Sequence, residues 1–175
     1  MLQRLPAHPE GLNMPDSKRQ GGFTYLLLLV ALSALALSLL KSQEDVQMRH
    51  TEQQEAELLF RGDQYRAAIA AYRAAGNGCF PVRVEQLLID KRGPTPRYHL
   101  RQVWVDPLTN DKTWGVIYDS QGRWVGVRSL GSGKPRRKAG FSHDAETFSK
   151  ASSYYDWAFK VDTDPKAPLP AACGR

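Results

Sequence analysis

The stretch that decides the fold is SKRQGGFTYLLLLVALSALALSLLKSQ, residues 17–43. Lys18, Arg19 and two glycines lead into a run from Phe23 to Leu40 that contains no charged side chain. At a rise of ~1.5 Å per residue, a helix of that length just crosses the hydrocarbon core of a bilayer. The two cations in front of the run predict that this end stays in the cytoplasm and that the residues after Lys41 are exported.

The small residues around the run argue against an ordinary secretory signal peptide. Such a peptide carries its small residues at a cleavage site behind the apolar region. Here the following residues, LLKSQEDVQMRH (39–50), contain no such site, and Gly21 and Gly22 stand in front of the run instead.

That order of residues resembles the N-termini of type IV prepilins and type II secretion pseudopilins. In those proteins a short basic leader ends in glycine and is followed by phenylalanine and a long apolar helix. The resemblance implies that a prepilin peptidase cuts between Gly22 and Phe23 and methylates the new N-terminus. Thr24 fits the family pattern. Leu27 departs from it, because the fifth mature residue is usually a glutamate that neutralises the N-terminal amine of a neighbouring subunit.

The departure at Leu27 is compatible with a tip or minor position in a filament, and also with recruitment by helix packing alone. The leader has two readings as well. Counted from Met1 it covers residues 1–22, whereas a start at Met14 leaves MPDSKRQGG, a short basic leader of the kind the family carries. The resemblance further implies that one set of apolar residues anchors the chain and packs the filament: Leu26, Leu27, Leu28, Leu29, Val30, Leu32, Leu35, Leu37 and Leu40.

Downstream of Lys41 the sequence predicts that the helix continues to about Ala75. No proline occurs between Leu26 and Cys79, and Leu58, Tyr65 and Tyr72 recur at helical spacing, with Leu59 and Ile69 beside them. Gly76 and Gly78 then indicate a stop. A short helix is expected at 82–90, followed by strands at 98–105, 112–119 and 124–130 joined by the turns DPLTND and DSQG.

These elements predict an α+β fold, with one long helix packed against a small antiparallel sheet. The resemblance extends into this part: EAELLFRGDQYRAAIAAY, the Asp-Pro turn before a Trp-Gly strand, and YYDWAF are similar to major pseudopilins. It implies a pilin-like fold with a leader at 1–22, a membrane or filament-core helix at 23–40, its amphipathic continuation at 41–76 and a periplasmic globular part at 77–175.

The formal charge of +6 is spread along the chain except for one dense cluster, GKPRRKAG (133–140). We interpret this cluster as a solvated turn and do not expect nucleic-acid binding. Cys79 and Cys173 form no CxxC pair, so a zinc site is not indicated. If this part of the chain is exported, a disulfide between them would tie the C-terminus to the start of the globular part.

No residue pattern predicts catalysis. The histidines (8, 50, 99 and 143) lack metal spacing, and none stands in a nucleophile motif. The four tryptophans (104, 114, 124 and 157) are expected in the core and sheet. The family resemblance raises calcium as an alternative to ordinary turn roles for four aspartates: Asp144, Asp156, Asp162 and Asp164.

The expected function is that of a structural pseudopilin subunit, not an enzyme, of a type II secretion system, assembled into a periplasmic filament that drives protein export. Its partners would be the prepilin peptidase, other pseudopilins and the inner-membrane platform. Its location would be the bacterial inner membrane, as a single-pass protein with a periplasmic domain. The alternatives are a minor pilin of a type IV pilus or DNA-uptake filament, whose loop at 134–138 contacts DNA, and a signal-anchored periplasmic enzyme or binding protein.

Overall fold

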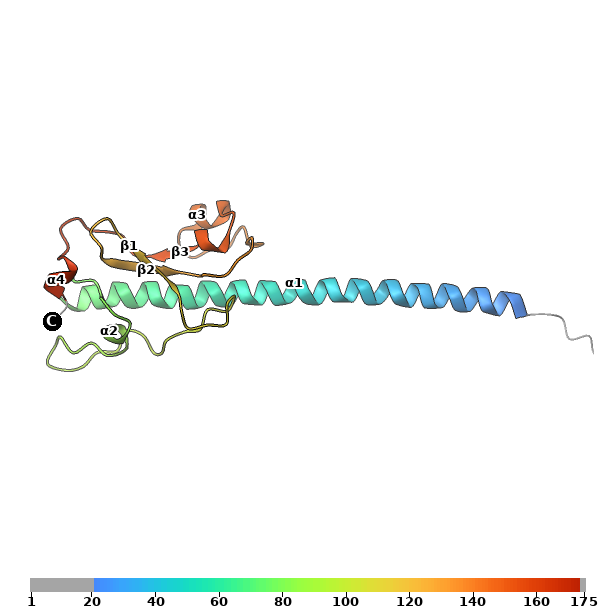
Figure 1. The fold of residues 1–175 in the computed structure, drawn as a ribbon, viewed down its shortest axis with the longest axis horizontal. Coiled ribbons are helices and arrows are strands. Elements are labelled where there is room, and N and C mark those ends of the chain that lie inside the picture. The colour runs from blue at the N-terminus through green and yellow to red at the C-terminus, as the bar shows by residue number, and fades with distance from the viewer. Residues whose placement is uncertain (1–20, 174–175) are drawn as a thin grey trace, which may run out of the picture. The chain divides into compact units, whose positions relative to one another are not determined.

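The computed structural model describes residues 21–173 and shows an α+β chain with one long N-terminal helix and a small antiparallel sheet (Figure 1). The chain divides into an N-terminal unit, Met1–Asp45, and a C-terminal unit, Val46–Arg175. The elements, in order, are α1 (Gly21–Ala75), α2 (Glu85–Leu88), β1 (Gly115–Tyr118), β2 (Trp124–Arg128), α3 (Ala145–Lys150), a 3₁₀ turn (Tyr154–Asp156), β3 (Ala158–Lys160) and α4 (Pro170–Cys173).

Helix α1 confirms the predicted helix and its end. Cations satisfy the last carbonyl groups of the helix: Arg92 donates to the Tyr72 carbonyl at 2.6 Å and Arg97 to the Ala75 carbonyl at 3.4 Å. Gly78, at φ 75°, then takes a left-handed conformation that suits glycine and turns the chain away.

The three strands form one antiparallel sheet in the order β1-β2-β3. The predicted DSQG turn joins β1 to β2, with Asp119 accepting backbone N–H groups of Gln121 and Arg123, and with Gly122 at φ 74°. Val116, Val127 and Phe159 stand opposite one another across the sheet and share a face.

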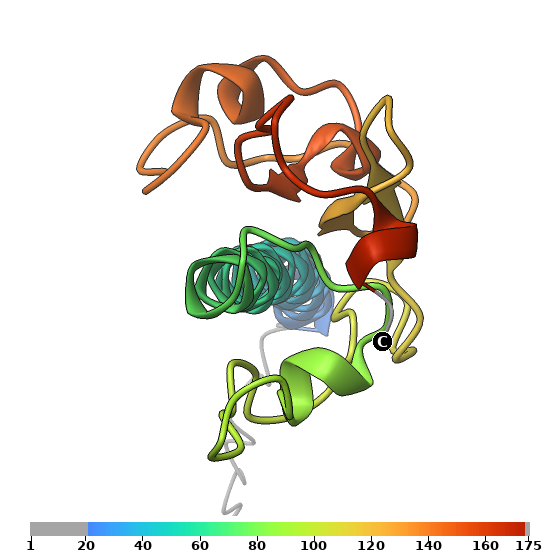
Figure 2. The same ribbon diagram turned by 90° about the vertical axis from the view of Figure 1, so that its left-hand side faces the viewer.

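In the C-terminal unit, helix α1 lies between two layers (Figures 1 and 2). The sheet and α3 lie on one side of it, and α2 with its flanking loops lies on the other. The apolar residues predicted at helical spacing form a stripe along α1 that is buried in this unit: Leu58, Tyr65, Ile69 and Tyr72 are all at most 2% exposed. Their partners in the core include Leu87, Trp114, Trp124, Val125, Val127, Phe148, Trp157 and Phe159.

Gly62 is the point of closest approach between α1 and the sheet. A Cβ added there would overlap the ring of Phe159 in β3. A glycine inside a helix lowers helix stability by about 1 kcal/mol relative to alanine. The close packing of Phe159 explains why position 62 is nevertheless a glycine. Gly62 lets the helix backbone lie directly against an aromatic ring of the sheet.

The strand predicted at 98–105 is wrong. This segment is irregular, and the two isolated bridges nearest to it, Asp90–Arg97 and Asp106–Asp111, lie just outside it. Side chains satisfy its carbonyl groups instead: Trp114 Nε1 donates to the Trp104 carbonyl at 2.8 Å, and Arg61 donates to the Val105 carbonyl at 2.8 Å. The aromatic and β-branched residues here serve burial beside α1, not strand pairing.

The other two predicted strands are present but shorter than predicted. Only Gly115–Tyr118 of the segment 112–119 and Trp124–Arg128 of the segment 124–130 form strands. The DPLTND turn is present but joins no two strands. Strand β3 was not predicted, because three residues in YYDWAF are too few to show alternation. The helix predicted at 82–90 is the single turn α2.

The C-terminal segment is fixed to this framework by a disulfide and an arginine. Cys79 and Cys173 are bonded, with their Cα atoms 5.6 Å apart. Arg123, only 2% exposed, donates to the carbonyls of Asp164 and Ala167 and pairs with Asp119. Burial alone would raise the pKa of Asp119, but the backbone N–H and guanidinium of Arg123 outweigh it and lower that pKa.

Substitution of Gly62 tests the close approach. Gly62→Val is expected to lower the free energy of unfolding of the domain by about 1–3 kcal/mol, because the new side chain overlaps Phe159. Chemical denaturation of the full chain in detergent, followed by tryptophan fluorescence, measures this. Ala67→Val, at an exposed position of the same helix, is the control and should change little. Equal effects of the two variants would contradict the packing role.

Candidate functional site

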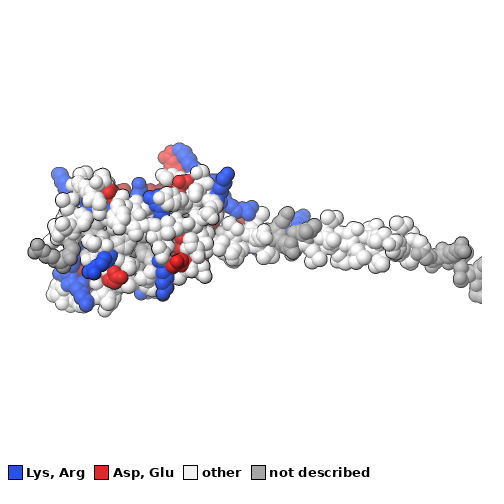
Figure 3. Space-filling model, in the orientation of Figure 1, with Lys and Arg blue, Asp and Glu red and all other residues white. Residues whose placement is uncertain are grey.

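The first candidate site is the apolar segment of the N-terminal unit. Gly22–Leu39 forms a helical window of mean hydropathy 2.2, none of which is buried by the rest of the chain. In Figure 3 it shows neither basic nor acidic side chains. Every residue of the predicted anchoring set except Leu40 is exposed, from 42% at Leu29 to 68% at Leu37, and Leu39 belongs with them. Leu40 lies outside the residues whose side chains are described.

The hydroxyl groups of Ser33 and Ser38 within this segment are satisfied by the helix itself. Ser33 Oγ donates to the Leu29 carbonyl at 2.8 Å, and Ser38 Oγ donates to the Ala34 carbonyl at 2.8 Å. Each hydroxyl proton is therefore satisfied within the helix, as a spanning helix requires in a medium without water. The segment is long and apolar enough to span a membrane, by length and composition.

The predicted processing residues begin this helix. Phe23 is 71% exposed, and a Cβ added to Gly22 would meet nothing within 4 Å. Packing within the described residues therefore gives no reason for glycine at position 22, in contrast to Gly62. Lys18, Arg19, His8 and the alternative starts Met1 and Met14 lie outside the described residues.

The second candidate site is the basic loop, Gly133–Gly140, which is held by a buried carboxylate that sequence reasoning missed. Glu55 of α1 is 1% exposed. It accepts the backbone N–H groups of Arg136 at 2.6 Å and Arg137 at 3.0 Å, and the Tyr154 hydroxyl at 2.8 Å. Burial, and then the hydrogen bond to Glu55, raise the pKa of Tyr154, so this hydroxyl stays protonated and donates.

A signal for Glu55 was available in the sequence. It lies three residues before Leu58 on the buried stripe, where a carboxylate has to find donors. A second buried carboxylate, Asp106, is completely shielded and accepts from Ser129 Oγ at 2.6 Å and from the Leu108 N–H at 2.9 Å. It was read only as a turn residue, and the partner Ser129 could not be inferred from sequence distance.

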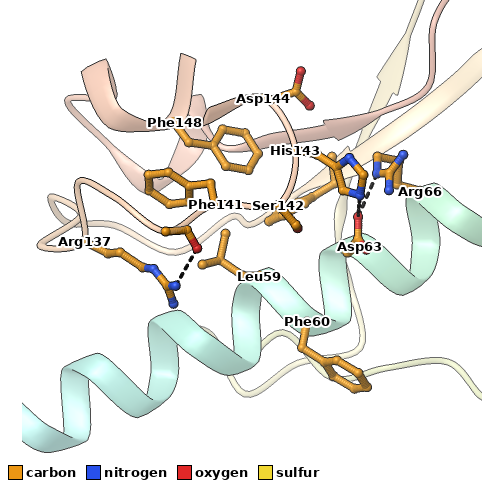
Figure 4. A pocket seen from close by; sticks show the side chains of 12 residues that line it. Leu59, Phe60, Asp63, Arg66, Arg137, Phe141, Ser142, His143, Asp144 and Phe148 are labelled. Atoms are coloured by element: carbon orange, nitrogen blue, oxygen red, sulfur yellow. Dashed lines mark hydrogen bonds and ion pairs between the residues drawn. The ribbon is translucent and has the colours of Figure 1, made fainter. Parts of the chain in front are cut away.

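A pocket of about 250 Å³ lies between α1 and the segment that follows the basic loop (Figure 4). Leu59, Phe141 and Phe148 give it an apolar wall, and Asp63, Arg66 and His143 stand together at one end. Arg66 Nε contacts Asp63 Oδ1 at 2.7 Å.

The polar end of this pocket does not form a nucleophilic triad. His143 Nε2 lies 3.9 Å from Asp63 Oδ1, beyond hydrogen-bond distance, and the His143 side chain is half exposed. Within residues 21–173 no hydrogen bond joins Ser142 to His143, although the two are adjacent. Of the other histidines that the structure describes, His50 is exposed and His99 Nε2 forms a hydrogen bond with Asp90 Oδ2 at 3.0 Å.

The four candidate calcium aspartates have separate environments. Asp156 caps the 3₁₀ turn, and hydrogen bonds from Ser153 and Ser152 lower its pKa. Asp164 pairs with Arg73 at 3.0 Å, Asp144 precedes α3 at φ 49°, and Asp162 offers its carbonyl to Arg73. No three carboxylate, histidine or cysteine side chains gather around a cation position in the part of the chain that the structure describes.

A buried cluster fixes the C-terminal end of α1. Asp90, 4% exposed, accepts both Nε and Nη2 of Arg92 at 2.8 Å, and the guanidinium lies 3.4 Å from the centre of the Tyr72 ring. The hydrogen bond from Arg92 lowers the pKa of Asp90 far below its usual range, against the opposing effect of burial.

Replacing Glu55 tests its hold on the basic loop. Glu55→Ala leaves three donors without an acceptor and is expected to lower the free energy of unfolding by about 3 kcal/mol, whereas Tyr154→Phe should lower it by about 1 kcal/mol. Glu57→Ala is the control on the same helix; its carboxylate is 53% exposed. Denaturation of the full chain measures all three, and a Glu55→Ala effect no larger than that of Glu57→Ala would refute the role.

The Asp90 cluster predicts a pH dependence. Because the folded pKa of Asp90 is lowered, its contribution to stability is complete above the unfolded pKa of about 3.9 and is lost as the pH falls toward the folded value. Asp90→Asn should therefore be less stable than the parent by about 2 kcal/mol at neutral pH, and this gap should narrow below pH about 4. Denaturation curves across pH 3–7 measure it; a constant gap would be the contrary result.

Comparison with known proteins found no relative of this chain. No protein-family model, curated protein or solved structure matches the chain.

Proposed function

We propose that this chain is a structural subunit of a pseudopilin-type filament in a type II secretion system. After cleavage between Gly22 and Phe23, its apolar helix would leave the bilayer and pack beside the helices of other subunits. The exported domain would form the filament surface, and the filament would drive protein export. The chain would act as substrate of a prepilin peptidase and as a building part, without catalysis of its own.

The observation that carries the proposal is the exposed apolar face of Gly22–Leu39 on a helix that then becomes the spine of a domain. An apolar surface of that size needs a cover, and lipid or other helices of the same kind are the two covers that suit it. A simple anchor would be satisfied by lipid alone. The second half of the same helix is already covered by its own sheet and by α2.

Gly22 supports processing over simple anchoring. None of the described residues packs against Gly22, so we attribute the small residue at this position to recognition by another protein. A peptidase that must fit the backbone at the scissile bond is such a partner. The Cys79–Cys173 disulfide adds to the case for export, because disulfides persist in oxidising compartments such as the periplasm.

Leu27 favours a minor or tip position. It is 54% exposed and offers no carboxylate to a neighbouring N-terminal amine. An unpaired ammonium group in an apolar helix bundle is costly, so a subunit without the usual glutamate fits best where no neighbour needs that pairing.

The proposal is tested by the mass of the mature N-terminus. The full chain is expressed with a prepilin peptidase, and mass spectrometry is expected to find a chain that begins at methylated Phe23. Gly22→Val should block cleavage nearly completely, because a branched side chain would stand at the scissile bond. Gly21→Val, one residue further from that bond, is the matched control and should still be cut.

Two results would overturn this assignment. An intact leader carrying Lys18 and Arg19 would favour a signal-anchored periplasmic module. Cleavage of Gly22→Val at the rate of the parent chain would show that the peptidase does not read this glycine.

A further inference from the structure

Strand β1 forms one edge of the sheet, and alternate residues turn their main-chain groups away from it. The strand order β1-β2-β3 leaves one side of β1 without a neighbouring strand. The Asp119 N–H, just after the strand, donates to the Arg123 carbonyl at 3.0 Å, on the β2 side. Because main-chain groups alternate in direction along a strand, Ile117 also faces β2, whereas Val116 and Tyr118 face outward. Among the described residues, no hydrogen bond from outside the sheet reaches the main chain of Val116 or Tyr118.

This edge lacks the features that usually prevent a sheet from pairing with another chain. Such features include a charged side chain or a proline on the edge strand, or a bulge within it. The two outward-facing residues are apolar or aromatic, with Val116 43% exposed and Tyr118 62% exposed. The irregularity between Ile117 and Tyr118 leaves Val125 of β2 without a partner, so the extra residue lies on β2 and β1 stays regular. The opposite edge strand, β3, has three residues and carries the exposed Lys160.

A mostly apolar pocket of about 70 Å³ adjoins the end of this edge. Tyr118, the last residue of β1, lines it together with Val82 and two prolines, Pro168 and Pro170. Val82 is 45% exposed, and Leu169, between the two prolines, is 54% exposed. A free strand edge and an adjoining pocket are the two parts of a site for an extended peptide, because the edge supplies main-chain hydrogen bonds and the pocket selects a side chain.

We propose that β1 binds an extended segment of another polypeptide chain, which adds a fourth strand to the sheet. The main chain of that segment pairs with Val116 and Tyr118, and β-branched or aromatic side chains opposite them make favourable cross-strand contacts. A small apolar residue of the segment enters the pocket beside Tyr118. The inference goes beyond the proposed function, since it needs neither cleavage after Gly22 nor assembly of a filament.

A second copy of this chain is the less favoured occupant. Antiparallel pairing of two β1 strands would set Val116 opposite Tyr118 of the copy. The copy would then bring its Gly115 and Trp114 toward the pocket. Glycine has no side chain to insert, and Trp114 is 7% exposed within its own core. A different chain is therefore the occupant that uses both the edge and the pocket.

The experiment measures exchange of amide protons with water by NMR, in the full chain in detergent micelles, isotopically labelled at valine and tyrosine. The probe is a hexapeptide of alternating valine and threonine with blocked ends. At about 1 mM peptide, the amide protons of Val116 and Tyr118 are expected to exchange at least about threefold more slowly, because main-chain pairing shields them. The amide proton of Tyr98, an exposed residue outside the sheet, should be unaffected.

Peptide and protein variants separate edge pairing from adsorption to the surface. The peptide N-methylated at every residue cannot donate hydrogen bonds and should give no protection, whereas methylation of its threonines alone leaves one donor edge and should preserve protection. Val116→Pro removes an outward N–H without breaking a bond to β2 and should abolish most of the protection of Tyr118. Val82→Ser should weaken peptide binding about threefold or more, and Ile89→Ser, equally exposed but outside the pocket, should not.

Unchanged exchange of Val116 and Tyr118 with the unmethylated peptide would overturn the proposal, as would equal protection by the fully methylated peptide. Slower exchange of the same amide protons when the chain alone is concentrated would overturn it in favour of a second copy. An uncut leader in the peptidase experiment would remove the filament assignment and leave this inference standing, because peptide binding at β1 does not depend on cleavage.

Discussion

Burial of a single stripe of α1 between two layers holds the C-terminal unit together. From Leu58 to Tyr72 the stripe contacts the sheet through Gly62 and Phe159, and it contacts the 80–105 segment through Tyr65 and Tyr72. The sheet has only three short strands, and a sheet of that size does not hold a fold without a helix to cover it. The helix therefore supplies the core to which every other element of the domain is added.

The same helix carries two surfaces with opposite requirements. Its second half finds apolar partners within the chain, and its first half finds none among the described residues. This difference separates Gly62 from Gly22. An aromatic ring lies against Gly62, whereas none of the described residues lies within 4 Å of a Cβ added at Gly22. Packing of the fold explains the glycine at position 62, and recognition by another molecule is the explanation we favour for the glycine at position 22.

Sequence reasoning predicted the helix, its stripe, its end at Ala75 and the β1–β2 hairpin, because each depends on neighbours within a few residues. It placed a strand at 98–105, where composition reflects burial against α1, and it missed β3, whose pairing comes from distant Val127. The spacing of Glu55 from Leu58 signals its burial, but its donors could not be predicted, since residues 136, 137 and 154 lie about 80 to 100 residues away. Contacts of that range have no local pattern in the sequence.

The Cys79–Cys173 bond has a mechanical consequence for any subunit that is pushed or pulled along its helix. It joins two points 94 residues apart, so the sheet and its loops form a closed ring attached just beyond the end of α1. A tensile load that enters through the N-terminal half of the helix cannot unravel the chain past that ring without breaking a covalent bond. In the unloaded chain the same closure lowers the chain entropy of the unfolded state, which corresponds to about 4–5 kcal/mol, and so favours refolding of the domain after a partial opening.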